Sequence, residues 1–252
     1  MLCMPICKGA RLKIERANHH ITDIELRIDG LEKRLIVTAQ VDANTGYEFI
    51  KCDFTDIKDR NAAEALAIVL GDAIHNLKCA LDHVWFETVN RVIPSGDWKR
   101  TKFPVYPTAD TLKDALERLK INISTPNFFS FIVGKIQPYD AGNFSIRAIH
   151  QIDTRDKHSL LIPVMHYSSI GDIYVEDQHR HVTKGSTWGT TDPLPHFVTF
   201  ERGLHIKNPG SASFNVMFEY GNAGRETRMM DTLRFYSQDI LAVVGLFEQF
   251  IE

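Results

Sequence analysis

The sequence predicts an α+β fold with a helical core, and three stretches of the chain support this prediction. Residues 56–93 carry apolar side chains at helical spacing over a long distance. Residues 35–54 are rich in β-branched and aromatic residues, which favours an N-terminal hairpin. Residues 161–220 consist of short apolar runs separated by glycine, proline and polar residues, which is typical of a small antiparallel sheet. We expect one domain over residues 1–252, in which 161–220 could form a β-rich subdomain.

The elements at the start of the chain follow from local composition. Residues 10–34 place apolar side chains among charged ones at roughly helical spacing, which predicts a first helix. In the hairpin, residues 42–46 read Asp-Ala-Asn-Thr-Gly, a turn sequence between two strand-like runs. Thr55 or Asp56 can cap the long helix, and the Pro-Ser-Gly segment after Ile93 ends it.

The elements after the long helix are shorter. Residues 103–107 must be extended, because each proline disfavours helix in the residue before it. Short helices are expected over about residues 108–120, 125–137 and 143–160, the second with proline at its first helical position. Residues 226–252 have one continuous apolar face and predict a C-terminal helix.

Composition and charge restrict the class of protein. The chain has 252 residues, of which 44% are hydrophobic and 24% charged, and its formal net charge is -3 with histidine neutral. This balance is typical of a globular protein with a substantial core, and it argues against a protein whose whole surface binds nucleic acid. No run approaches the roughly 18 apolar residues of a membrane span, and the apolar start is too short for a signal peptide. We therefore expect a cytoplasmic protein that does not enter a membrane.

The four cysteines do not indicate a disulfide framework or a zinc site. Cys52 lies in a strand-like run and Cys79 in a helical one, and a chain of this length does not need disulfides. Cys3 and Cys7 form one closely spaced pair, whereas a structural zinc site needs a second pair of ligands. We expect neither a metal nor a cofactor.

The long helix carries an unusual polar stripe on one side, and its opposite side is apolar. An exposed helix face usually carries Lys, Glu, Gln and Arg, which favour helix. The stripe carries short side chains that compete with the backbone for hydrogen bonds, so their position in mid-helix needs a reason. At roughly 100° per residue, the stripe falls within a sector of about 120°. It comprises Asp72, His75, Asn76, Cys79, Asp82 and His83.

Two interpretations of the stripe stay open. A fully satisfied network of Asp, His and Asn could fix how two helices pair. Alternatively, the stripe performs chemistry, since histidine titrates near neutral pH and aspartate can orient an imidazole.

A second polar cluster lies in residues 147–158. If this segment is helical, its polar side chains share one side, and they could face the stripe across a common site. The alternative is a solvated face with ordinary ion pairs, such as Asp153 with Lys157. The cluster comprises Arg147, His150, Asp153, Thr154, Lys157 and His158.

Two motifs give the chain a resemblance to a known family. Residues 75–83 read His-Asn-Leu-Lys-Cys-Ala-Leu-Asp-His, and residues 156–158 read Asp-Lys-His. This combination resembles a widespread set of bacterial proteins that carry a helix of the form H-N-L-[RK]-x-A-L-D-H and a downstream D-K-H. A helix and a hairpin before the motif are also usual in that set, so the similarity extends over most of the chain. The resemblance supports the fold and implies no particular activity.

A weaker resemblance is to HEPN domains, helical proteins that include metal-independent ribonucleases. Their hallmark is an arginine followed, after four to six residues, by a histidine. Arg147 and Arg155 are too close to His150 and His158 respectively, and Arg147 is too far from His158. The hallmark is therefore absent from this chain. A P-loop, a G-x-S-x-G and an H-E-x-x-H are absent as well.

The first functional hypothesis is a cleft between the two polar helices that acts on a phosphate-bearing ligand, for example RNA, without a metal. Asp72 and Asp82 would orient the imidazoles, and Arg147 and Lys157 would contact the anion. The catalytic candidates are His75, His83, His158, Asp72 and Asp82. The ligand-binding candidates are Asn76, Arg147, His150, Asp153 and Lys157.

Two alternatives come from other classes. The polar stripe could belong to a non-catalytic interaction protein, where it would fix helix pairing within the chain or across a homodimer. The same residues could also serve a metal-dependent hydrolase. His179 and His181 would add two imidazoles on one face if they lay on a strand, although we expect them in a surface loop.

Overall fold

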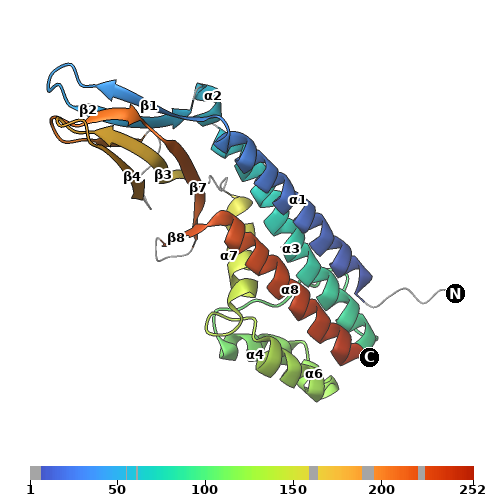
Figure 1. Cartoon of the computed structure of the whole chain (residues 1–252). Helices are drawn as coiled ribbons and strands as arrows, with labels where there is room; N and C mark the ends of the chain where they lie inside the picture. Colours follow the sequence, from blue (N-terminus) through green and yellow to red (C-terminus); the bar gives the residue numbers. More distant parts are fainter. Residues whose placement is uncertain (1–6, 55, 61, 159–163, 189–195, 221–224) are drawn as a thin grey trace.

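The computed structural model describes residues 7–54, 56–60, 62–158, 164–188, 196–220 and 225–252. Its fold is α+β, as predicted: a bundle of long helices carries a β region at one end (Figure 1). Three long helices run side by side, and a shorter helix packs against two of them, α3 and α8. The long helices are α1 (Lys8–Glu32), α3 (Ala62–Val92) and α8 (Met229–Ile251), and the shorter one is α7 (Phe144–Asp156).

The main hydrophobic core lies between these four helices. Each helix contributes the apolar face that its helical periodicity predicts, for example Ile24 from α1, Leu77 from α3, Ile149 from α7 and Phe247 from α8. All four side chains are fully buried. Helices α1, α7 and α8 all pack against α3, and exposed members of the polar stripe, such as Asp72, His75 and His83, stay at its surface.

The helical segments between the long helices match the predicted order. The predicted helix over 56–93 is present as one short turn followed by α3, and residue 61 lies outside the described residues. A capping box between Thr108 and Thr111 starts the next helix. Residues 103–107 are not helical, in agreement with their prolines. The segments are α2 (Ile57–Arg60), α4 (Ala109–Arg118), α5 (Ile121–Ser124), α6 (Pro126–Phe131) and the π-helical turn η1 (Ile132–Ile136).

Two antiparallel sheets form the β region. The first has the order β1-β2-β5 and contains the predicted hairpin. The second has the order β4-β3-β7-β8, with β6 also paired to β3. A small apolar cluster of Ile50, Cys52, Ile170 and Ile173 joins β2 to β3. The strands are β1 (Leu35–Val41), β2 (Glu48–Phe54), β3 (Val164–Glu176), β4 (Val182–Trp188), β5 (His196–Thr199), β6 (His205–Asn208), β7 (Ser211–Tyr220) and β8 (Arg225–Arg228).

The structure differs from the sequence prediction at two places. Residues 226–228 were expected to start the C-terminal helix, but they belong to β8, because pairing with β7 extends the backbone up to Met229. The stretch 161–220 does not pair only within itself, since β5 pairs with β2 of the N-terminal hairpin. Within the described residues, no helix is both long enough and apolar enough to cross a membrane.

Gly210 turns the chain between β6 and β7 in a conformation that other residues rarely adopt. Its φ is +83°, and an added Cβ would lie 2.0 Å from the carbonyl oxygen of Gly171. Gly210→Ala is therefore expected to lower the free energy of unfolding by about 1–3 kcal/mol. Gly185→Ala in β4 is the control, because nothing lies within 4 Å of its Cβ position. Denaturant titration of both variants checks this, and equal midpoints would contradict it.

Candidate functional site

Helices α3 and α7 run antiparallel and bring the two polar clusters of the sequence into contact. An added Cβ at Gly71 would lie 2.5 Å from a carboxylate oxygen of Asp156. One turn further along, His75 on α3 contacts Asp153 on α7. The absent side chain of Gly71 lets the two helices approach closely enough for this contact.

The centre of the site is a carboxylate with a partner on each side. The Asp153 side chain is only 4% exposed, yet both of its oxygens are satisfied. His75 Nδ1 lies 2.8 Å from Oδ1, and Lys157 Nζ donates to Oδ2 at 2.5 Å. A buried carboxylate is stable only when it is paired in this way. The His75 side chain is 52% exposed, so the imidazole stays open to solvent while its orientation is fixed.

The other nitrogen of the same imidazole faces a thiol. His75 Nε2 lies 3.4 Å from Cys79 Sγ, one helical turn along α3. Cys79 is partly buried. Burial raises the pKa of this thiol, the charge of Lys13 on α1 opposes the rise, and Asp82 and Asp153 add to it. Cys79 is therefore protonated at neutral pH.

Asp82 has partners other than an imidazole. Lys78 Nζ donates to Asp82 Oδ1 at 2.5 Å, and the backbone N–H of Phe103 donates to the same oxygen at 2.8 Å. The Lys78 side chain is only 6% exposed. Asp82 thus neutralises a buried ammonium group and holds the chain that follows α3. The predicted role of Asp82 as an orienter of histidine has no counterpart in these contacts.

His150 lies beside this ion pair on α7. Burial lowers its pKa, and the charges of Lys78 and Arg147 lower it further, against the opposing effect of Asp153 and Asp82. The imidazole is therefore neutral at neutral pH. Its Nδ1 is buried and has no hydrogen-bond partner among the described residues. Arg147 forms an ion pair with Asp140 in the loop before α7.

The remaining members of the stripe face α1 instead of α7. An added Cβ at Gly9 would lie 2.9 Å from Nδ1 of His83, which places that imidazole against the first turn of α1. Burial lowers the pKa of His20 on α1 and Arg16 lowers it further, while Asp72 raises it. Asp72 therefore lies near His20, and Asn76 donates from its side chain to the backbone oxygen of Asp72. The stripe serves two helix interfaces, one on each side.

Among the described residues, no hydrogen bond joins the three predicted catalytic histidines to one another. His83 is eight residues from His75, which corresponds to about 12 Å along the helix axis. His158 is exposed and lies just beyond α7, where its backbone N–H donates to Arg155. Its imidazole makes no hydrogen bond or ion pair with a described residue. Of the three histidines, His75 is the one held by a carboxylate of the second cluster.

The sequence analysis missed the contribution of α1. Lys13 lies close enough to Cys79 to influence its thiol, and Arg16 lies close to His20. Neither cation forms an ion pair with a described residue. Both lie on the side of α1 that faces the stripe. The spacing of Lys13, Arg16 and His20, at roughly one and two helical turns, was the signal in the sequence that could have identified this face.

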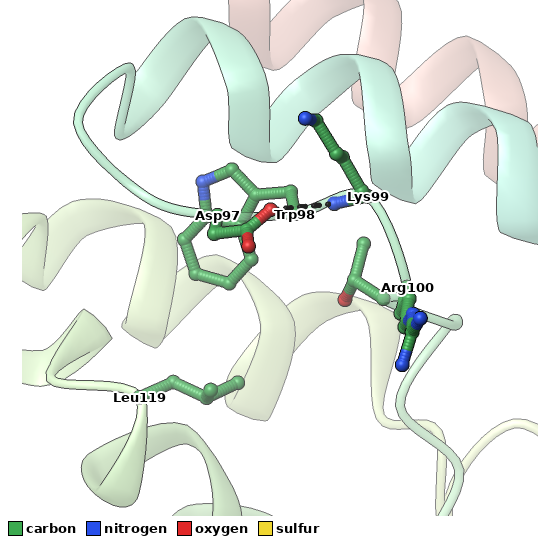
Figure 2. A pocket seen from close by; sticks show the side chains of 6 residues that line it. Asp97, Trp98, Lys99, Arg100 and Leu119 are labelled. Atoms are coloured by element: carbon green, nitrogen blue, oxygen red, sulfur yellow. Dashed lines mark hydrogen bonds between the residues drawn. The ribbon is translucent and has the colours of Figure 1, made fainter.

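A pocket of about 530 Å³ lies away from the predicted residues, in the chain between α3 and α4 (Figure 2). Figure 2 shows the ring of Trp98 above Leu119. Trp98 is buried, whereas Lys99 and Arg100 are exposed. Trp98 Nε1 donates to the backbone oxygen of Ile93, which fixes the indole at the end of α3. None of the residues selected from the sequence lines this pocket.

The described residues do not offer a metal site. No three or more His, Cys, Asp or Glu side chains among them gather so that they could hold an ion. His179 and His181 lie in the turn between β3 and β4, in agreement with the expected surface loop, and His181 contacts Asp177 at 3.4 Å. The metal-dependent alternative therefore gains no support from the arrangement of these side chains.

Comparisons with known proteins leave the site to be interpreted from its own chemistry. No family model, no curated protein and no solved structure matches the chain.

Proposed function

We propose that the chain performs metal-independent acid–base chemistry on an anionic, phosphate-bearing ligand, with RNA as the first candidate. The ligand would lie on the outward side of α3 between α1 and α7. The observation that supports this most directly is the contact between His75 Nδ1 and Asp153 Oδ1 at 2.8 Å, in which the carboxylate is buried and the imidazole is exposed. A histidine held in this way has one nitrogen fixed by the carboxylate, and its second nitrogen, here beside Cys79 Sγ, can exchange a proton.

Three cations near the polar stripe support an anionic ligand. Lys13 and Arg16 approach the stripe from α1, and Lys157 approaches it from α7. In the proposed reaction, His75 Nε2 takes a proton from an attacking hydroxyl group such as the 2′-OH of RNA. Lys13 and Arg16 contact the phosphate, and Asp153 stabilises the imidazolium that forms.

The test is cleavage of an end-labelled single-stranded RNA oligonucleotide in the presence of EDTA. His75→Ala is expected to lower the rate by about 100-fold or more, because a positioned general base contributes about 10²–10⁴-fold. Lys13→Ala is expected to weaken RNA binding and to make the dependence of binding on salt shallower. Lys33→Ala is the matched control, because Lys33 caps the far end of the same helix, about 30 Å from Lys13 along its axis.

Two results would contradict the proposal. In the first, the wild-type chain neither binds nor cleaves the RNA. In the second, His75→Ala unfolds at a much lower denaturant concentration than the wild type and so loses activity only with its fold. The second result would favour the alternative that the stripe fixes helix pairing, which the buried Asp153 with partners on both α3 and α7 also supports.

We also propose that the protein acts in the cytoplasm. Cys7, Cys52 and Cys79 are free thiols, and Cys7 and Cys52 are fully buried. Free thiols are usual in the reducing cytoplasm, whereas exported proteins of this size often carry disulfides.

A further inference from the structure

Three side chains on α3 and α7 line up in the order thiol, imidazole and carboxylate. Cys79 Sγ lies 3.4 Å from His75 Nε2, and His75 Nδ1 lies 2.8 Å from Asp153 Oδ1. In cysteine and serine acyl-transfer enzymes a nucleophile, a base and an orienting carboxylate stand in this same order. Lys157 fixes the orientation of the Asp153 carboxylate in turn, because it donates a hydrogen bond to the second oxygen.

The hydrogen bonds define which nitrogen of His75 carries the proton. An ionised carboxylate only accepts hydrogen bonds, so His75 Nδ1 must be protonated to bond with Asp153. In the neutral ring Nε2 then has a free lone pair, and this lone pair faces the thiol of Cys79. The arrangement therefore presents a base to the S–H group.

Cys79 differs from the other described cysteines in the solvent exposure of its thiol. Cys7 and Cys52 are completely buried, and burial raises the pKa of each thiol to about 12. Cys79 is partly exposed and lies beside the half-exposed ring of His75. Because burial also raises the pKa of Cys79, its thiol needs a base at the moment of attack, which is what His75 provides.

We propose that Cys79 is a catalytic nucleophile for acyl transfer, with an activated carboxylic ester or thioester as the substrate class. The cations Lys13 and Arg16 on α1 favour a substrate that carries negative charge next to the acyl group. The proposal rests on the same His75–Asp153 pair as the proposed function, but it does not require a phosphate ligand.

The reaction has two balanced halves. The S–H proton of Cys79 moves to His75 Nε2 while sulfur attacks the carbonyl carbon, and the leaving alcohol or thiol then takes this proton as its bond to the acyl group breaks. The acyl group is now a thioester on Cys79. His75 Nε2 next takes a proton from water, the hydroxide adds to the thioester carbon, and the C–S bond breaks. The carboxylic acid leaves, and the proton held by His75 returns to the sulfur.

The experiment uses the full chain in a Cys3→Ser background and p-nitrophenyl acetate as the probe. We expect a burst of p-nitrophenol and one acetyl group per chain, which peptide mapping of the acid-quenched protein places on Cys79. Cys79→Ser should remove the thioester. His75→Gln, which preserves much of the side-chain volume, should slow acetylation by about 100-fold, as loss of a positioned base does. His181→Ala in the exposed turn is the control and should react like the wild type.

Asp153→Asn tests the positioning role of the carboxylate. An amide can donate to His75 Nδ1 and so favours the tautomer with the proton on Nε2, which cannot accept from the thiol. Relative to the wild type, we expect Asp153→Asn to be acetylated more slowly and with an altered dependence of the rate on pH. Its circular dichroism spectrum should be unchanged.

The outcomes distinguish this inference from the proposed function. Acetylation of Cys79 without RNA cleavage would support Cys79 as a nucleophile and contradict the proposed phosphate-bearing ligand. RNA cleavage without His75-dependent acetylation would support the proposed function and contradict the role of Cys79 as a nucleophile. Acetyl groups on other residues, or equal rates in the wild type and His75→Gln, would overturn the inference.

Discussion

Trp85→Ala is expected to lower the free energy of unfolding by about 3–5 kcal/mol, the usual cost of emptying a large aromatic site in a core. Trp85 is fully buried in α3, and its ring stacks on Phe128 of α6 with 5.5 Å between centroids. It also meets the ring of Phe103 edge-on, and its Nε1 donates to Thr101 Oγ1 at 2.8 Å. The substitution therefore leaves a cavity and an unpaired hydroxyl group between α3 and the segments that follow it.

The control is the next residue on the same helix. Phe86 is 44% exposed, so Phe86→Ala should change the free energy of unfolding by less than about 1 kcal/mol. Urea denaturation followed by far-UV circular dichroism measures both variants. Similar midpoints for the two variants would show that the aromatic cluster around Trp85 contributes little to the stability of the bundle.

Asp82→Ala is expected to cost about 2–4 kcal/mol, because it leaves the ammonium group of Lys78 without its carboxylate in a buried position. The backbone N–H of Phe103 also loses its acceptor. We place the value slightly below that for a fully buried pair because the Asp82 side chain is 32% exposed, and water can reach the space it leaves.

A double-mutant cycle separates the charge effect from simple truncation. Lys78→Met in the Asp82→Ala chain should recover about 1–2 kcal/mol, because a methionine fills the site without a buried charge. Asp23→Ala on α1 is the control, since it breaks an exposed i,i+4 pair with Arg27 and should cost about 0.3–0.5 kcal/mol. If Asp82→Ala lowered the free energy of unfolding by no more than Asp23→Ala, the Lys78–Asp82 pair would not stabilise the fold. The catalytic role predicted for Asp82 would then be the better explanation of its position.

Helical periodicity predicted the helices and their faces well, because burial of one apolar face is a local property of the sequence. It also selected His75 and Asp153, two residues 78 positions apart that the fold brings to 2.8 Å. Periodicity could not show which residues of the polar stripe face which neighbouring segment. Asp72 and His83 face α1, His75 faces α7, and Asp82 bonds to the chain that follows α3. This division depends on where other parts of the chain pack against α3.

The residues that sequence reasoning missed owe their importance to tertiary contacts. In the sequence Lys78 looks like any lysine on a helix surface, but it is buried in the folded chain, and its role follows from that burial. The strand at residues 225–228 was mistaken for helix because its pairing partner in β7 lies outside any local window. The π-helical turn at Ile132–Ile136 continues a predicted helix and left no signal in the apolar pattern.

The pairing of β5 with β2 has a consequence for how the chain is made. β2 is complete once Phe54 has left the ribosome, but the strand that covers its second edge, His196–Thr199, is synthesised more than a hundred residues later. Until then, the N-terminal hairpin exposes unpaired backbone groups to other nascent chains. Contacts between such distant segments form slowly, so this edge is where a refolding or newly made chain is expected to associate wrongly.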